Sequence, residues 1–328
     1  MLTHKKIVWM LAPLFALCVY AIILLQSVRT ETGKDKSIIV IMKSNDIRTE
    51  FWQTVRAGAK TAAKEFQAKA DIRGPLQETD VHEQIGLVEQ AIAEKPQAIV
   101  LAPAAADLLV PVAEKVRQAG IKLVVIDSPL DGNPGDSFIA SNNLDAGRKA
   151  GRALASMTKG RPAVAILSDK NGSPTATDRE TGIREALAAD PAAVVVGTGY
   201  TTNQEERAYQ VTKQLLADHP EINGMICLNE TAALGAAKAI KELNKSAAVK
   251  LVGFGASIYE IKLLEEGALH ATLVQKPFNL GYLGVKAAVE LIDGKKANPL
   301  DNIDSTVVTK ENMYDPENQK LLFPFVER

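Results

Sequence analysis

Polar side chains follow several short apolar runs at the points where those runs end. Asn45 comes shortly after the run at 38–42, and Asp127 directly follows the run at 122–126. Asn229 follows a further run of this kind. Such runs are typical of strands buried on both faces of a parallel sheet, and ligands of these sheets bind beyond the carboxyl ends of the strands. Amide and carboxyl groups hydrogen-bond with hydroxyl groups, so the pattern predicts a pocket for a small sugar or polyol.

Two adjacent aromatic residues, Phe51 and Trp52, lie just beyond the first of these runs. Neighbouring residues on a helix point about 100° apart, so both rings cannot face the same core. One of them is expected to face the cleft, where an aromatic ring can pack on the C–H groups of a sugar. Taken singly, the polar residues also suit turns and helix caps, and only their convergence on one sheet edge favours binding.

The sequence lacks the residue spacings of the common catalytic and metal sites. Its histidines, His4, His82, His219 and His270, are scattered and show no HExxH spacing. It has no nucleophile elbow and no Walker phosphate loop. The chain is therefore predicted not to be an enzyme and to need no metal and no cofactor. A net charge of -1 gives no electrostatic reason to expect nucleic acid as a partner.

Strand-like and helix-like segments alternate along most of the 328 residues, which is typical of an α/β fold with parallel sheets. Three segments of the first half recur in the same order, each about 125 to 128 residues later. Two similar lobes are therefore predicted, each a parallel sheet flanked by helices, with a cleft between them. Further strand patterns at 271–273 and 307–309 indicate that the chain crosses between the lobes more than once and so forms a hinge. The paired segments are IIVIMKS with AVAILSD, QAIVLAP with GMICLNE, and KLVVIDSP with KLVGFGAS.

The N-terminal segment 7–26 is twenty residues without a charge, long enough to cross a bilayer as one helix. Its length favours an uncleaved transmembrane anchor over a cleavable signal peptide, whose apolar region is shorter and ends in a small-residue cleavage site. Lipoprotein processing at Cys18 is a third alternative, although Leu17 departs from the small residue expected there. The chain is thus predicted to cross the cell membrane once, with its binding domain outside, at the cell surface or in the periplasm.

Four segments carry a resemblance to a known family: FIASNNLDAGRKAG at 138–151, ICLNETAALGAAKAI at 226–240, LVGFGAS at 251–257 and LVQKPFNLGYLGVKAA at 273–288. They resemble the type I periplasmic sugar-binding proteins related to ribose-binding protein, over about residues 37 to 310. The resemblance implies the periplasmic-binding-protein-like I fold, with lobe crossings near Ser141, Gln275 and Leu300. The predicted division is 1–36 for the anchor and tether, 37–141 plus 276–300 for the N-terminal lobe, and 142–275 plus 301–328 for the C-terminal lobe.

The resemblance also implies which residues bind the ligand. It places Phe51 and Trp52 where the family's aromatic pair sandwiches the sugar. Asp127 and Asn229 fall on a ligand-binding aspartate and asparagine of the family. Gln275 falls on a glutamine that contacts ligand near a hinge crossing.

Departures from the family pattern limit what can be carried over. Gly255 stands where the family has a second aspartate, and Ser128 and Thr177 stand where ribose-type members have arginines. Arg179 matches a family arginine nearer the structure of its own lobe. The ligand is therefore not expected to be bound as ribose is, and its class stays open. The full set of candidate ligand-binding residues is Asn45, Phe51, Trp52, Asp127, Ser128, Thr177, Asn203, Asn229, Gly255 and Gln275.

Two uses of such a binding module are expected from the resemblance. In the first, the closed, liganded protein delivers its sugar to the membrane permease of an ABC transporter. In the second, closure is relayed to a membrane sensor, either a histidine kinase or a chemoreceptor. Family frequency favours import, whereas an anchor that holds the module beside a partner helix suits sensing. Import is the first prediction and sensing the alternative.

Overall fold

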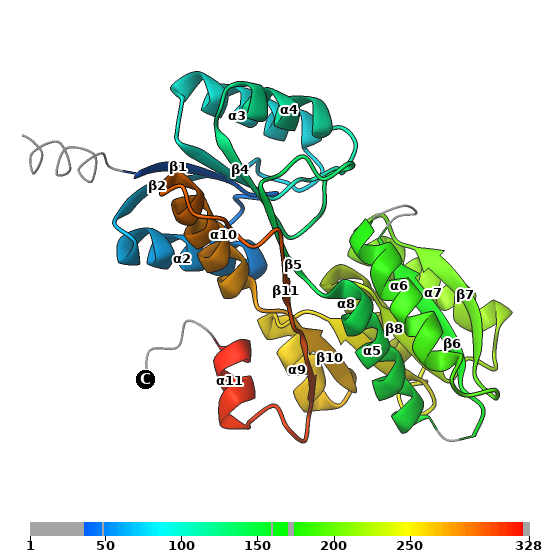
Figure 1. Cartoon of the computed structure of the whole chain (residues 1–328). Coiled ribbons are helices and arrows are strands. Elements are labelled where there is room, and N and C mark those ends of the chain that lie inside the picture. The colour runs from blue at the N-terminus through cyan, green and yellow to red at the C-terminus, as the bar shows by residue number, and fades with distance from the viewer. Residues whose placement is uncertain (1–35, 48, 159, 170–173, 324–328) are drawn as a thin grey trace, which may run out of the picture.

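The computed structural model describes residues 36–47, 49–158, 160–169 and 174–323. These residues form two lobes, each built on one six-stranded sheet with helices on both faces (Figure 1). The arrangement confirms the predicted fold of two similar α/β lobes. Almost all neighbouring strands are parallel, and the exception is the pair at the edge of the second sheet.

The N-terminal lobe has the strand order β11-β5-β4-β3-β1-β2. Side chains alternate along a strand, so Ile38 and Val40 face the core under α2 and α10, whereas Ile39 and Ile41 face the core under α3 and α4. This two-sided burial explains the unbroken apolar run in the sequence. The elements are β1 (Lys36–Ile41), α2 (Glu50–Glu65), β2 (Ala68–Arg73), α3 (Val81–Glu94), β3 (Ala98–Leu101), α4 (Val110–Gln118), β4 (Lys122–Ile126), β5 (Ser137–Ser141), α10 (Pro277–Ile292) and β11 (Leu300–Ile303).

The C-terminal lobe has the corresponding order β12-β10-β9-β8-β6-β7. Val164 and Ile166 of its first strand face the core under α5 and α6, and Leu167 faces the core under α7, α8 and α9. The elements are α5 (Asn143–Met157), β6 (Ala163–Ser168), α6 (Pro174–Leu187), β7 (Val194–Tyr200), α7 (Glu205–Asp218), β8 (Gly224–Cys227), α8 (Glu230–Glu242), β9 (Lys250–Phe254), α9 (Ile258–Glu266), β10 (Ala271–Val274), β12 (Thr306–Thr309) and α11 (Pro316–Leu322).

Segments paired by the internal repeat occupy equivalent places in the two sheets: β1 with β6, β3 with β8, and β4 with β9. Each sheet also has an edge strand that the sequence pattern did not reveal, β2 and β7. Both are only partly buried, and β2 alternates apolar residues with Lys69, Asp71 and Arg73. The charged residues of β2 interrupt its apolar pattern, which is why hydropathy alone did not separate this strand from a loop. In β7 the apolar residues 194–196 are followed by Gly197, Thr198 and Gly199, so its apolar run ends halfway along the strand.

The chain crosses between the lobes after β5, after β10 and after β11. Ser141 ends β5 and Gln275 follows β10, and the Gln275 amide donates a hydrogen bond of 2.8 Å to the Ser141 hydroxyl. β11 pairs with β5 as far as Ile303, so the third crossing falls after this residue and not at Leu300. Residues 301–303, predicted for the C-terminal lobe, thus lie in the N-terminal sheet, because β11 adds to it in parallel register.

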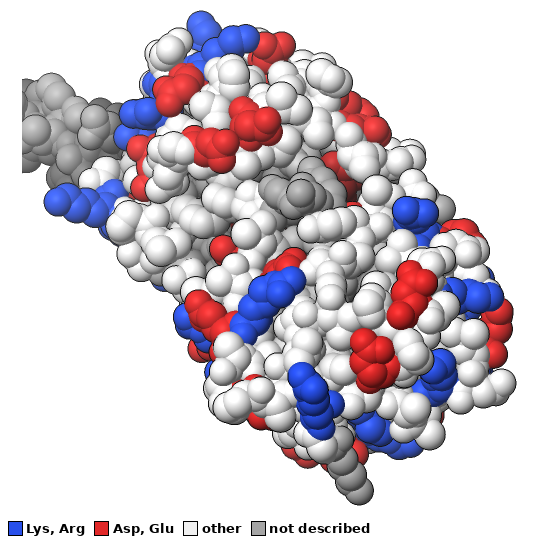
Figure 2. Space-filling view, turned by 90° about the vertical axis from the view of Figure 1, so that its right-hand side faces the viewer, with Lys and Arg blue, Asp and Glu red and all other residues white. Residues whose placement is uncertain are grey.

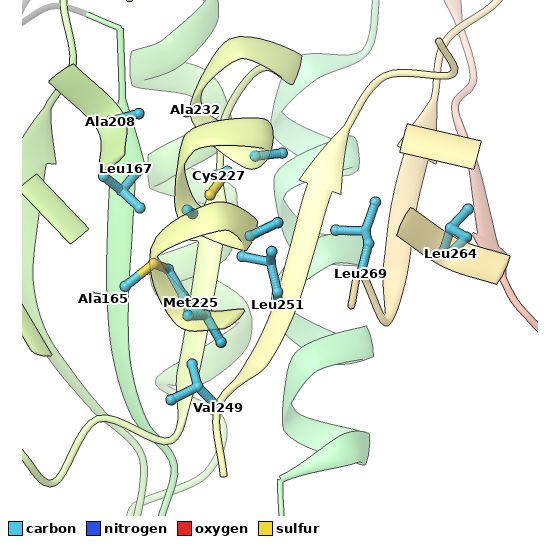
Figure 3. Close-up of a cluster of buried hydrophobic side chains, with 14 of the residues drawn as sticks. Ala165, Leu167, Ala208, Met225, Cys227, Ala232, Val249, Leu251, Leu264 and Leu269 are labelled. Atoms are coloured by element: carbon cyan, nitrogen blue, oxygen red, sulfur yellow. The ribbon is translucent and has the colours of Figure 1, made fainter. Parts of the chain in front are cut away.

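The predicted membrane span at 7–26 and Cys18 lie outside the described residues. Within the part of the chain that the structure describes, no helix combines the length and the apolar character needed to cross a membrane. Cys227 is a free thiol buried in the C-terminal lobe, where Leu167, Ala232 and Leu251 belong to the same core (Figure 3). Burial raises the pKa of this thiol well above its ordinary value, so the thiol stays protonated and unreactive.

Basic and acidic side chains are interspersed over the face drawn in Figure 2. Charges of both signs close together largely cancel at distances beyond a Debye length. This face therefore presents no extended field of one sign.

Candidate functional site

A cleft of about 640 Å³ lies between the lobes at the carboxyl ends of the strands. The structure brings most of the predicted residues to this cleft. A shallower hollow of about 780 Å³ lies near the starts of β3 and β4, with a mainly apolar lining. Only the cleft combines polar groups from both lobes, so it is the candidate ligand site. The predicted residues that line it are Phe51, Trp52, Asp127, Ser128, Asn203, Asn229, Gly255 and Gln275.

Lys43 organises the N-terminal side of the cleft. Its ammonium group lies 2.6 Å from Asp127 Oδ2 and 2.5 Å from Ser128 Oγ. The Ser128 hydroxyl also donates to Asp127 Oδ2 at 3.1 Å and lies 3.4 Å from Thr175 Oγ1 in the other lobe. Asp127 has a φ of 69°, a left-handed conformation that turns the chain as β4 ends. The end of β4 thus holds the charged carboxylate of Asp127, which can accept hydrogen bonds from hydroxyl groups.

The aromatic pair sits at the start of α2. The rings of Phe51 and Trp52 are 5.1 Å apart, with an angle of 83° between their planes, so they contact each other edge to face. Trp52 is only 1% exposed, and its indole N–H donates to Glu78 Oε1 at 2.5 Å. Phe51 is half-buried. Of the two rings, Phe51 therefore offers more surface to a ligand, as expected for neighbours on a helix.

Arg179 is a residue of the cleft that the residue-by-residue carry-over did not assign to the ligand. It is buried on α6, donating to Asn143 Oδ1 at 2.9 Å and to the backbone oxygen of Leu228 at 2.6 Å. Its guanidinium lies 4.5 Å from the centre of the Phe254 ring. Burial lowers the pKa of Arg179 to about 10, against the opposing effect of the charges of Asp127 and Asp169. It therefore remains positively charged at neutral pH.

Two predicted residues lie away from the cleft lining. Thr177 is exposed on α6, while Thr175, Ala176 and Arg179 of the same helix line the cleft. Asn45 is exposed, and its amide oxygen accepts a hydrogen bond from Arg56. A position just beyond a strand's carboxyl end places a residue at the correct edge of the sheet. It does not determine which way the side chain points.

The two asparagines of the C-terminal lobe have local structural roles as well as a place in the cleft. Asn229 is the N-cap of α8, where its Oδ1 accepts from the backbone N–H of Ala232 at 2.8 Å. Asn203 has a φ of 55°, which suits a turn residue. The cap and turn alternatives noted from the sequence are thus present beside the predicted ligand role. Their binding of ligand stays a prediction.

Gly255 marks the departure from the family's second aspartate, and a carboxyl group occupies the space behind it. A methyl group added at Gly255 would overlap Glu260 Oε2. Gly255 also has a φ of 156°, which disfavours residues with a side chain. An aspartate at this position would therefore strain the backbone and would require the Glu260 carboxyl to move. In the sequence, Ser257 and Glu260 have the spacing of a capping box. This spacing indicates a helix start but not that the Glu260 carboxyl lies behind Gly255.

Glu260 is completely buried, and neither of its carboxyl oxygens has a hydrogen-bond partner of ordinary geometry. Burial raises its pKa well above the ordinary value of 4.5, and the charge of Glu230 raises it further. The nearby backbone N–H of Ser257 acts in the opposite direction. Burial likewise raises the pKa of Glu230, and the charge of Glu50 in the other lobe adds to this rise, whereas the Ser257 hydroxyl lowers it.

A cleft between two like lobes joined by three crossings defines a hinged binding module, and known proteins share this architecture. The chain matches the family model for the periplasmic binding protein domain over residues 38–296. It is 31% identical over 281 residues to the D-ribose/D-allose-binding protein of Pseudomonas aeruginosa, covering 83% of this chain and 86% of that relative.

Solved structures give the same result. A carbohydrate transporter solute binding protein from Agrobacterium radiobacter, in complex with D-arabinose, has a TM-score of 0.82 and 31% identity, covering 88% of this chain and 99% of that one. An ABC transporter solute binding protein from Agrobacterium vitis, with bound D-fucose, has a TM-score of 0.80 and 30% identity, covering 87% and 99%. The chain belongs to the periplasmic binding protein family, among the type I members related to ribose-binding protein, as the sequence motifs predicted.

Proposed function

We propose that this chain is an extracytoplasmic solute-binding protein that takes up a small sugar or polyol between its lobes and delivers it to an ABC transporter permease. The observation that carries this proposal is the composition of the cleft. Its N-terminal side offers Lys43, Asp127 and Phe51, and its C-terminal side offers Arg179 and Asn229. A ligand that bonds to both sides favours the closed state, because those contacts are incomplete when the lobes are apart.

Relatives support the choice of ligand class and of import over sensing. The names and structures of the relatives describe binding of D-ribose, D-allose, D-arabinose and D-fucose. Others are named ribose import binding proteins. Sensing through a kinase or chemoreceptor remains the alternative, and the partner captured with the liganded, closed protein distinguishes the two uses.

The test of ligand class is a thermal-shift screen of the purified full-length chain. The panel contains D-ribose, D-allose, D-arabinose and D-fucose, with an amino acid and a nucleoside as controls. A sugar that binds the native state raises the unfolding midpoint by mass action. A sugar concentration near 100 times the Kd adds about 2.7 kcal/mol to the free energy of unfolding. A rise with the amino acid or nucleoside alone would contradict the proposal.

Asp127→Ala and Asn229→Ala should each weaken sugar binding. Each change leaves a buried ligand hydroxyl without its partner, which costs about 1 to 3 kcal/mol, or roughly 5- to 150-fold in Kd. Isothermal titration measures the loss, and Asp107→Ala, a change at an exposed aspartate of the N-terminal lobe outside the cleft lining, is the control. Unchanged affinity in both cleft variants, with intact folding, would remove these residues from the site.

The proposed membrane anchor rests on the twenty uncharged residues at 7–26. An uncleaved span keeps the full-length chain in the membrane fraction after an alkaline wash, whereas cleavage releases a shorter, soluble protein. Mass spectrometry of the mature N-terminus separates the two cases and also detects a lipid on Cys18.

A further inference from the structure

The hollow of about 780 Å³ lies at the base of the N-terminal lobe, that is, at the end of its sheet where the strands begin. The cleft lies at the opposite end, so the hollow is separate from the sugar site. Its lining comes from the ends of α3, α4 and α10 and from the residues that lead into β3 and β4. Ile92, Leu291 and Ile292 belong to this lining and are half-buried. The base therefore offers apolar surface to a partner.

The corresponding connections of the C-terminal lobe are longer. Residues 95–97 and 119–121 lead into β3 and β4, whereas the longer segments 219–223 and 243–249 lead into the equivalent strands β8 and β9. Apolar residues of the longer segments belong to the buried core of their lobe. The hollow thus follows from the short connections of the N-terminal lobe and not from the fold that the two lobes share.

Exposed lysines surround the hollow. Lys95 and Lys122 belong to its lining, and Lys295 and Lys296 follow closely on the end of α10. Among the residues that the structure describes, none of these four lysines forms an ion pair with an acidic side chain, although other lysines of the same lobe do. The four, here termed the basal lysines, therefore place uncancelled positive charge around an apolar surface.

Acidic side chains near the base have partners of their own. Asp293 pairs with Lys36 at 2.7 Å, and Glu94 pairs with Arg73 at 2.7 Å. Asp136 accepts a hydrogen bond of 2.8 Å from the backbone at the start of β4. These carboxylates are engaged within the lobe, so the charge of the basal lysines is available to a partner outside it.

The N-terminal segment of the chain enters the lobe at this base. Lys36 begins β1, which lies beside β3 in the sheet, and β1 begins on the side of the lobe that lies away from the C-terminal lobe (Figure 1). Residues 27–35 join β1 to the proposed span at 7–26 and cover at most about 30 Å when fully extended. An uncleaved span therefore holds the base close to the bilayer.

We propose that the base of the N-terminal lobe docks on the anionic lipid surface of the membrane, with the basal lysines against lipid phosphates and the hollow against the apolar part of the lipids. This proposal rests on the membrane anchor proposed above. A lysine beside an anionic bilayer strengthens binding by about fivefold. Lysine side chains can also lay their apolar stems along apolar surface while the ammonium group stays in water, which suits a hollow with lysines at its rim.

Other occupants fit the base less well. Residues 27–35 are almost all polar or charged, so they do not match an apolar hollow. A second copy of the chain placed base to base would bring two sets of basal lysines together, and like charges repel. A membrane with anionic lipids offers negative charge and an apolar interior at the same place. It is therefore the partner that suits both features of the base.

Docking at the base leaves the sugar site accessible. The cleft opens at the carboxyl ends of the strands, and the six residues of β1 place those ends about 20 Å farther from the membrane than the base. The C-terminal lobe makes no part of the basal hollow, so it can still close on a ligand by rotation about the hinge. Sugar binding and membrane docking can therefore be measured independently.

The test measures acetylation of individual lysines by a water-soluble amine reagent on the full-length chain in lipid nanodiscs. One set of discs contains phosphatidylcholine alone, and a second set also contains the anionic lipid phosphatidylglycerol. Mass spectrometry reports each lysine separately. Lys95 and Lys122 should react about fivefold or more slowly in the anionic discs. Lys241 and Lys262, exposed on the C-terminal lobe, should react equally in both. At 1 M salt, where the Debye length falls to about 3 Å, the difference should disappear.

Lys295→Gln combined with Lys296→Gln removes half of the basal charge and leaves Lys95 and Lys122 as reporters. Docking should weaken by roughly fivefold for each lysine removed, so both reporters should regain most of their reactivity in anionic discs. The matched control is Lys241→Gln combined with Lys262→Gln, which removes the same charge from the other lobe and should leave the protection unchanged.

Equal reactivity of Lys95 and Lys122 in the two lipid sets would overturn the proposal, as would protection that survives the paired glutamine changes. Protection that is independent of lipid and is lost when each disc holds a single chain would identify a second copy as the occupant instead. A chain that is not retained in the discs would overturn the anchor and this proposal together. Sugar titration on the same discs tests the proposed sugar-binding function separately, and none of these outcomes would alter it.

Discussion

Gly281→Ala is expected to destabilise the protein by about 3 kcal/mol, because α10 and α2 touch at their backbones. A methyl group at Gly281 would overlap the carbonyl oxygen of Val55, and one at Gly58 would overlap the carbonyl oxygen of Phe278. Backbone atoms cannot move aside as the end of a flexible side chain can, so the two helices must separate. α10 begins just after the second crossing between the lobes, so its packing on α2 completes the core of the N-terminal lobe.

Urea unfolding measures this loss as a lower midpoint at unchanged slope. Gly86→Ala is the control, since Gly86 lies within α3 with no atom within 4 Å of the added methyl group. This change should stabilise by about 0.5 to 1 kcal/mol, because alanine is the better helix former. If Gly281→Ala proved as stable as the unchanged chain, the close approach of α2 and α10 would be wrong.

Glu260→Gln is expected to stabilise the ligand-free protein at neutral and alkaline pH. Burial, and then the charge of Glu230, raise the pKa of Glu260 well above 4.5 in the folded state. A carboxyl with a raised folded-state pKa favours folding fully below the unfolded-state pKa, and this contribution is lost as the pH rises toward the folded-state pKa. Within that window the unchanged chain should lose about 1.4 kcal/mol of stability per pH unit relative to the glutamine variant, which has no proton to lose.

Urea unfolding at a series of pH values above 4 tests this expectation. The two curves should lie close together at the acid end and diverge as the pH rises. Glu266→Gln serves as the control, because Glu266 lies on the same helix but is exposed and paired with lysines at its surface. A stability difference that did not change with pH would mean that Glu260 is ionised in the folded protein and has a partner there.

Arg179 illustrates what residue positions alone do not determine. Thr177, at which a family arginine was expected, precedes Arg179 by two residues on α6. Two residues on a helix correspond to about 200°, so their side chains leave on nearly opposite faces. Which face meets the cleft depends on how α6 packs on α5 and on the sheet, and this packing is not visible in a local pattern. The structure turns Arg179 inward and leaves Thr177 exposed.

Glu260 illustrates a second kind of limit. Ser257 and Glu260 have the spacing of a capping box, and Ser257 is the N-cap of α9 in the structure. Nothing local indicates that this carboxyl is fully buried behind Gly255. This burial requires the end of β9 to lie against the start of α9. It also requires a glycine at position 255, because Glu260 fills the space that a side chain there would need.

The sequence by itself determined the two-lobed α/β architecture, the repeat, and the strand ends that carry Asp127 and Asn229. It could do so because a strand buried on both faces must be continuously apolar, and because parallel strands bring their carboxyl ends to one edge. Tertiary structure alone decided the inward turn of Arg179, the crossing after Ile303, and the burial of Glu260 against Gly255. These depend on which elements pack together across long stretches of chain, and a residue's local pattern contains no information about its distant neighbours.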